Sequence, residues 1–113
     1  MHILTSCVLL KKTIMPISIY KQETAESIAW LCNDLWDLPT QIDELENWLK
    51  ANCNNLKPEK YIIDIAFDIR PTATGGGSAI SSESMKIMSE NNMDLFLSEY
   101  PNQIEHITEE NDD

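Results

Sequence analysis

The sequence predicts one two-layer domain of the α/β or α+β class, with three helices packed on a small sheet of three or four strands. Three observations support this fold class. Apolar residues recur at helical spacing in 23–37 and in 41–53, and they alternate along 61–70. The segment 61–100 has the length of one β-α-β unit. A chain of 113 residues with 42% hydrophobic content suits a single domain.

The N-terminal part leaves two interpretations open. A short apolar segment, 2–10, is separated by Lys11-Lys12 from a second one, 14–20. The two segments can form a hairpin at the sheet edge, where the missing backbone donor of Pro16 is tolerated. In the other interpretation Met15 is an alternative start, and 1–14 is a loose extension. At the other end, the acidic composition of 105–113 predicts a flexible tail, so the globular domain is expected to span 1–104.

Two helices are expected next. The stripe that predicts a helix over 23–37 consists of Ala25, Ile28, Ala29, Cys32, Leu35 and Trp36. Leu38-Pro39 should end this helix, and Thr40 should cap a second one over 41–53. Its apolar face consists of Ile42, Leu45, Trp48 and Leu49.

The second half of the chain predicts strand, helix and strand. In 61–70 the alternating apolar residues are Ile63, Ile65, Phe67 and Ile69. A loop with three glycines leads to a helix that Ser81 should cap, with Met85 and Met88 facing inward and a stop at Asn91-Asn92. A last strand over 93–100 ends at Pro101. Such crossovers nearly always join parallel strands, although the glycine-rich loop leaves an antiparallel arrangement open.

Charge is distributed unevenly along the chain. Nineteen Asp and Glu stand against eight Lys and Arg, and neither 22–49 nor 87–113 contains a Lys or Arg. Like charges repel in a compact protein, so this excess indicates a basic protein partner. A pI near 4.4 argues against direct binding of nucleic acid or an anionic membrane. No apolar run reaches the roughly 20 residues of a membrane span.

Trp30 is the strongest candidate for an interface residue. On the predicted helix it lies opposite the apolar stripe and among acids, where a large aromatic side chain can anchor a partner. The alternative is that the N-terminal segment or the second helix covers it. The predicted partner-binding residues are Glu26, Trp30, Asp34, Asp37, Asp43, Glu44 and Glu46.

No catalytic, cofactor or metal site is predicted. The three widely spaced cysteines, Cys7, Cys32 and Cys53, indicate reduced thiols in a cytoplasmic protein. The triple glycine lacks the lysine of a phosphate-binding loop. A small metal-dependent enzyme that uses Asp64, Asp68 and Asp94 is one alternative function. Another is a nucleic-acid mimic that inhibits a DNA- or RNA-binding protein.

The segment 41–101 resembles small bacterial domains of uncharacterised function from toxin–immunity loci. The similarity lies in Trp-Leu-Lys at 48–50, Asp-Ile-Arg at 68–70, the glycine-rich loop, Ser-Ser-Glu-Ser-Met at 81–85 and Leu-Ser-Glu-Tyr-Pro at 97–101. This resemblance implies a non-enzymatic immunity protein that neutralises a basic, nuclease-like toxin domain through an acidic surface. The charge distribution favours the same kind of partner.

Overall fold

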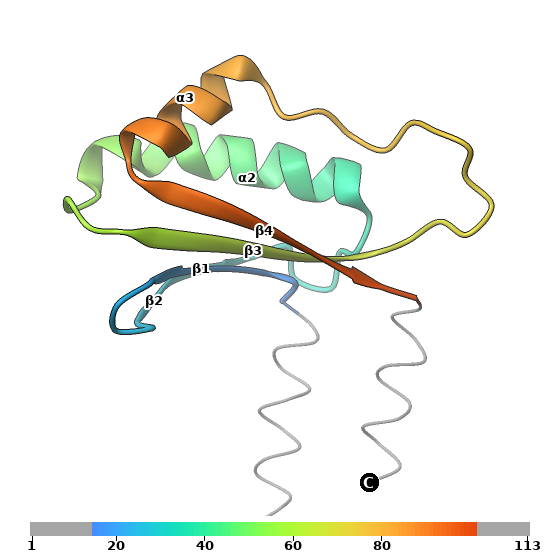
Figure 1. Ribbon diagram of the computed structural model, residues 1–113, viewed down its shortest axis with the longest axis horizontal. Helices are drawn as coiled ribbons and strands as arrows, with labels where there is room; N and C mark the ends of the chain where they lie inside the picture. The colour runs from blue at the N-terminus through green and yellow to red at the C-terminus, as the bar shows by residue number, and fades with distance from the viewer. Residues whose placement is uncertain (1–14, 102–113) are drawn as a thin grey trace, which may run out of the picture.

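The computed structural model describes residues 15–101. The elements are β1 (Ile17–Lys21), β2 (Ser27–Leu31), α2 (Leu38–Asn52), a 3₁₀ turn (Cys53–Asn55), β3 (Tyr61–Asp68), α3 (Ser82–Glu90) and β4 (Met93–Tyr100). Both helices lie on the same side of the sheet, so the described part of the chain has two layers (Figure 1). The apolar segment 2–10 and the predicted tail 105–113 fall outside the described residues.

The four strands form one mixed sheet in the order β2-β1-β3-β4. Strand β1 pairs antiparallel with both β2 and β3. Strands β3 and β4 are parallel, and α3 connects them across the helical layer. The predicted β-α-β unit over 61–100 is therefore present, with its two strands parallel.

The prediction of three helices is wrong, because the described residues contain only two α-helices and one 3₁₀ turn. The segment 23–37 forms the turn of a hairpin, strand β2 and a loop that leads to α2. The turn uses left-handed backbone at Ala25, with φ of 62°, where glycine or asparagine is the usual residue. Without such a residue the hairpin has no turn signature, and the spacing of its apolar residues coincides with that of a helix.

The start of α2 also differs from the prediction. Asp37, and not Thr40, is the N-cap residue, and its Oδ2 accepts a hydrogen bond of 3.2 Å from the Thr40 backbone N–H. Pro39 lies within the first turn, where its missing N–H leaves no helical hydrogen bond unmade. The expected cap of α3 is confirmed, since the Ser81 hydroxyl accepts from the Ser84 backbone N–H at 3.1 Å.

The core lies between the sheet and the helices. Its fully buried residues come from β1, α2 and β3, namely Ile17, Ile19, Leu45, Leu49, Tyr61, Ile63 and Ile65. Helix α3 contributes Met88, whereas Met85 is exposed, contrary to the prediction that both methionines face inward. Residues of β3 that alternate with the core residues point to the opposite face of the sheet.

One buried polar side chain joins the loop 32–37 to the sheet. Gln41 is fully buried, and its Nε2 donates to the carbonyl oxygens of Leu35 at 2.8 Å and Ala66 at 2.9 Å. Ala66 lies opposite Pro16 and donates its own N–H to the Pro16 carbonyl at 2.9 Å. The reciprocal bond of an antiparallel pair cannot form, because proline has no N–H. Gln41 therefore supplies the donor that β1 lacks at this position.

Candidate functional site

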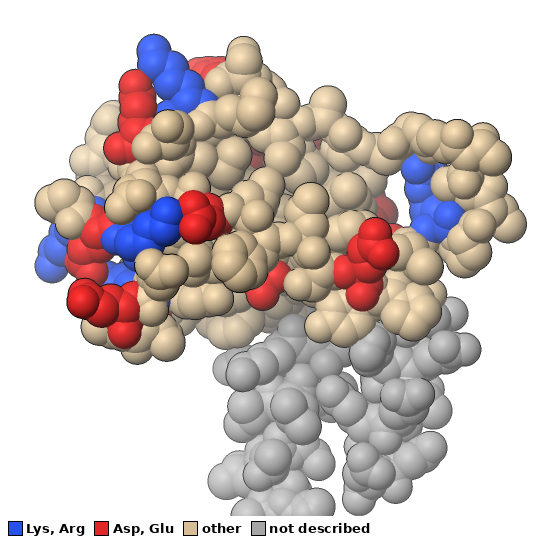
Figure 2. Space-filling model, viewed as in Figure 1, with Lys and Arg blue, Asp and Glu red and all other residues tan. Residues whose placement is uncertain are grey.

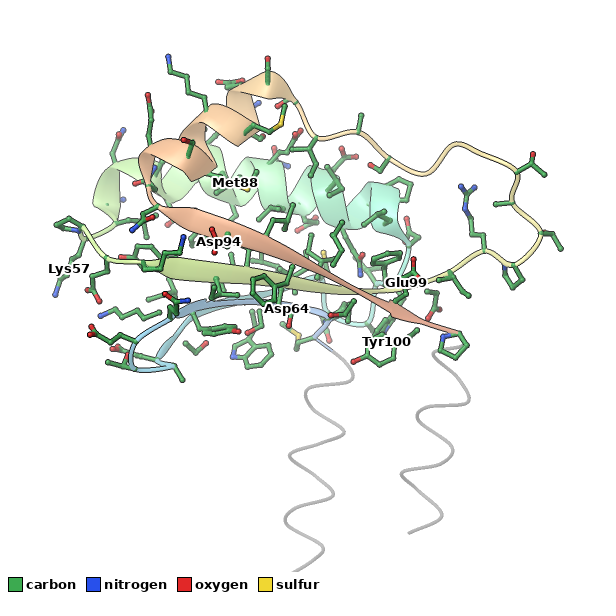
Figure 3. All side chains as sticks on the ribbon, viewed as in Figure 1. Lys57, Asp64, Met88, Asp94, Glu99 and Tyr100 are labelled. Atoms are coloured by element: carbon green, nitrogen blue, oxygen red, sulfur yellow. The ribbon has the colours of Figure 1, made fainter. Side chains whose placement is uncertain are left out.

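The side of the sheet away from the helices is the candidate site, and we call it the open face. Neither described helix covers it, and the sheet's lower side in Figure 1 has no described element beneath it. Strand alternation and the pairing registers assign to it Ser18, Tyr20, Trp30, Ile62, Asp64, Ala66, Asp94, Phe96, Ser98 and Tyr100. Figure 3 shows Asp64 and Tyr100 on this side of the ribbon.

Two large aromatic residues of the open face are accessible to a partner. Trp30 on β2 is 40% exposed, and Phe96 on β4 is 49% exposed. A single exposed apolar side chain needs no explanation, but aromatic side chains on an uncovered sheet face are typical of interaction surfaces. Trp30 and Phe96 lie on the two outermost strands, so a partner that touches both must span the sheet.

A hollow of about 250 Å³ lies between the strands on this face. Small side chains, Ser18, Ala66 and Ser98, make its floor, while the larger Trp30 and Tyr100 stand beside it. Its other lining residues are Met15, Pro16 and Asp64. The size difference between neighbouring side chains therefore creates a depression beside an exposed tryptophan.

Asp64 supplies the negative charge of the hollow. It is half-buried, and its Oδ1 accepts a hydrogen bond of 3.1 Å from the Ser98 hydroxyl on the neighbouring strand. No Lys or Arg among residues 15–101 forms an ion pair with Asp64. The carboxylate retains free lone pairs, so it can accept a hydrogen bond from a cationic ligand.

Three of the predicted acids have structural partners. Glu26, in the hairpin turn, forms an ion pair of 3.2 Å with Lys21. Asp37 caps α2, and its hydrogen bond from the Thr40 hydroxyl is the main cause that lowers the pKa of Asp37. Glu46 accepts from the Ser81 backbone N–H at 2.8 Å, and this bond lowers the pKa of Glu46. These side chains join elements of the fold to one another.

The other three predicted acids, Asp34, Asp43 and Glu44, are exposed. None of them forms an ion pair with a described Lys or Arg. Asp34 lies in the loop before α2, and the other two lie on α2 itself, in the helical layer. The structure therefore does not bring the seven predicted residues together, because Trp30 belongs to the opposite face of the sheet.

A second hollow, of about 470 Å³, lies at the end of the sheet where α2 begins. Its walls include Trp36, Phe67 and the carboxylates of Asp68 and Glu99. The glycine-rich loop closes one side, and Arg70 Nη2 donates to the Gly75 carbonyl in that loop at 3.0 Å. The loop glycines have positive φ angles, so this part of the loop requires glycine.

The aspartates of the alternative enzyme hypothesis are not gathered at one point. Asp94 forms a hydrogen-bonded ion pair of 2.7 Å with Lys60, and Asp64 is bonded to Ser98. Within the described part of the chain, no three His, Cys, Asp or Glu side chains are grouped so that they could hold a metal ion.

The sequence predicts the exposure of Trp30 but not the surface around it. Alternation in 93–100 puts Met93, Leu95 and Leu97 on one face and Phe96, Ser98 and Tyr100 on the other, but the neighbours of these residues on that face depend on the pairing with β3. Two local patterns indicate the open face: Ser18 alternates with buried isoleucines on β1, and Asp64 and Ala66 alternate with Ile63 and Ile65 on β3.

Comparison with known proteins gives no relative, since no family model, no curated protein and no solved structure matches this chain. Among the described helices, none has the length and apolar content needed to cross a membrane.

Proposed function

We propose that this protein binds a basic protein partner through the open face, and that the partner is a toxin domain that it neutralises. The observation that carries the proposal is that an exposed Trp30 and the half-buried Asp64 line one hollow on a sheet face that no element within residues 15–101 covers. The toxin as partner rests on the resemblance of 41–101 to domains of toxin–immunity loci.

The chemistry of the open face suits an Arg or Lys side chain. Its aliphatic stem can lie against the Trp30 ring while its charged group reaches Asp64 across the hollow. A charge-assisted hydrogen bond to a carboxylate is about twice as strong as a neutral one. The Ser98 hydroxyl fixes the acceptor through its hydrogen bond, so part of the ordering is already present.

The acids outside the open face have a different role in this proposal. A net charge of −11 over the chain attracts a basic protein from a distance and speeds its association. Asp34, Asp43 and Glu44 contribute to this field because no described basic residue neutralises them. Such charges change the association rate more than the final affinity.

The test compares two exposed apolar residues on opposite layers. The protein that co-purifies from the native cell is titrated against wild type, Trp30→Ala and Met85→Ala, since Met85 is exposed on α3. Loss of an interface anchor typically costs about 2 kcal/mol, so Trp30→Ala should weaken binding roughly thirtyfold. Met85→Ala should bind as wild type. Equal effects of the two variants would contradict binding through the open face.

Asp64→Asn tests the electrostatic part of the proposal. The amide keeps the size of the side chain and loses its charge, so affinity for a basic partner should fall about tenfold. Glu83→Gln is the matched control, because Glu83 is already paired with Lys50 at 3.6 Å in the helical layer. A partner that is acidic, or whose on-rate is independent of salt, would refute the proposal.

A further inference from the structure

The outer edge of β4 is the feature of the fold that the proposed function does not yet use. Strand β4 is the last strand of the sheet and pairs with β3 over its whole length, from Tyr61↔Met93 to Asp68↔Tyr100, without a shift in register. No strand within residues 15–101 pairs with its other side.

The backbone groups that face this free edge can be identified. The Tyr61 N–H donates to the Asn92 carbonyl and the Ile69 N–H to the Tyr100 carbonyl, each at 3.0 Å, so even-numbered residues point toward β3. Successive residues of a strand present their N–H and C=O to alternate sides. The free edge therefore displays the backbone groups of Met93, Leu95, Leu97 and Glu99.

The two edges of the sheet are not equally open to pairing. Strand β2 has only five residues, and the pairing of β1 with β2 is irregular between Ile19 and Tyr20. Short length and bulges are common protections of edge strands, as are lysine and proline. Strand β4 has eight residues, a regular register, and no Lys, Arg or Pro. It is long and regular enough to accept another strand.

The side chains along β4 would be covered by such a strand. Phe96 on the open face is 49% exposed, and Leu97 on the helix side is 54% exposed. The charged residues of the strand are both acidic: Asp94, which is paired with Lys60, and Glu99, which forms no ion pair with a described Lys or Arg. In Figure 2 the middle of the molecule is mostly uncharged, with Lys and Arg gathered toward the periphery of the view. The edge thus combines apolar and negative character.

We infer that the basic partner adds an extended segment to β4 as a fifth strand, one in which lysine or arginine alternates with apolar residues. This inference rests on the proposed function and names how the same partner is held. Main-chain hydrogen bonds to Leu95, Leu97 and Glu99 provide the pairing, and charge selects the segment. A second copy of this chain fits less well, because two acidic β4 strands would place like charges side by side.

The test uses a proline that blocks the edge without disturbing the sheet. The N–H of Leu97 points outward, so Leu97→Pro removes a donor for the added strand and no bond to β3. Leu97→Ala removes more of the side chain than Leu97→Pro does but keeps the backbone N–H, so it is the matched control. Glu99→Pro and Glu99→Ala form a second pair at another outward position, in case Leu97→Pro does not fold.

The probe is a dye-labelled, capped octapeptide of alternating lysine and valine, followed by fluorescence anisotropy at low salt. Each proline variant should bind it about tenfold more weakly than its alanine counterpart. A peptide of alternating lysine and proline has the same charge and should bind none of the proteins. No binding of the lysine–valine peptide to wild type, or equal binding by the proline and alanine variants, would overturn the inference.

Two further results separate this inference from the proposed function and from other occupants. Trp30 lies three strand spacings from β4, about 14 Å. Trp30→Ala should therefore weaken binding of the native partner and leave binding of the peptide unchanged. If Leu97→Pro binds the native partner as wild type does, edge pairing is wrong, while the proposal of binding through the open face is unaffected.

A dimer in sedimentation that Leu97→Pro dissociates would identify a second copy as the occupant and overturn the inference. Peptide binding that appears only after 102–113 is deleted would identify the chain's own C-terminal segment as the occupant, and it would also overturn the inference.

Discussion

Replacing Gln41 with leucine should destabilise the fold, because it removes two hydrogen bonds from a fully buried side chain. Gln41 Nε2 donates to the Leu35 and Ala66 carbonyl oxygens. Leucine has a similar size and no donor, so both carbonyls would lose their partner. The Ala66 carbonyl cannot recover one from β1, since Pro16 has no N–H.

The magnitude follows from the number of groups left unpaired. An unsatisfied buried acceptor costs about 1–3 kcal/mol, so two of them cost roughly 2–6 kcal/mol. The variant also removes Gln41 Oε1, which is buried without a hydrogen-bond partner among the described residues. Removing this atom should raise the free energy of unfolding by roughly 1–2 kcal/mol. The expected net loss is about 2 kcal/mol, a large part of a typical domain stability of about 5–15 kcal/mol.

Urea denaturation of wild type, Gln41→Leu and Asn47→Leu would measure this loss. Asn47 lies on the exposed side of the same helix, so its variant should stay within about 0.5 kcal/mol of wild type. Gln41→Glu should be less stable than Gln41→Leu at neutral pH, because an ionised carboxylate cannot donate a hydrogen bond and would be buried.

A double-mutant cycle tests the role of Pro16 directly. Pro16→Ala restores a backbone N–H opposite Ala66, so Gln41→Leu should cost about 1 kcal/mol less in that background. Additivity of the two substitutions would refute the reasoning, since it would mean that Gln41 does not replace the missing donor.

Three further predictions concern reactivity and stability. Burial, more than nearby carboxylates, raises the pKa of Cys32 to about 11. Alkylation at pH 8, followed by peptide mapping, should therefore be at least about tenfold slower at Cys32 than at Cys53. Comparable rates at the two cysteines would contradict this prediction. Because the unfolded thiol ionises near 9.0, stability should also fall as pH rises from 9 toward 11. The Ser81 N–H lowers the pKa of Glu46 in the folded state. The ionised Glu46 therefore adds to the free energy of unfolding above its ordinary pKa of 4.5, and this contribution is lost as pH falls below that value. In acid denaturation, wild type should therefore lose more stability than Glu46→Gln. Ala25→Gly should raise stability by about 0.5 kcal/mol, because glycine removes the strain of left-handed backbone at a smaller entropic cost; a loss in urea denaturation would show that the turn is not strained.

For Trp30 the sequence predicts that the side chain is exposed, but it does not predict which residues surround it. We expected Trp30 on the polar side of a helix, among acids of that helix. It is exposed, but it lies on β2 and lines the same hollow as Asp64, which is 34 residues later in the chain and is separated from it by Ser18 of β1. The pairing of β1 with both β2 and β3 creates this neighbourhood, and pairing between distant strands leaves no local pattern at Trp30.

The dispersal of the predicted acids has a similar reason. Glu26, Asp34 and Glu44 are close in sequence and were expected to form one surface with Trp30. A helix over 23–37 would place Glu26 and Asp34 near Trp30, with Glu44 on the helix that follows, whereas the chain reverses at the hairpin and again before α2. Each reversal moves the next acid to another part of the molecule.

The sequence by itself determined the elements whose pattern is local and unambiguous. The alternation in 61–70 predicted β3, the apolar stripe in 41–53 predicted α2, and Ser81 marked the start of α3. The tertiary structure decided the segment 23–37, because the pairing of β2 with β1 outweighs the helical spacing of its apolar residues. It also decided which face and which edge of the sheet the elements of 15–101 leave open. These depend on where α2 and α3 pack, and that is set by contacts between residues far apart in the chain.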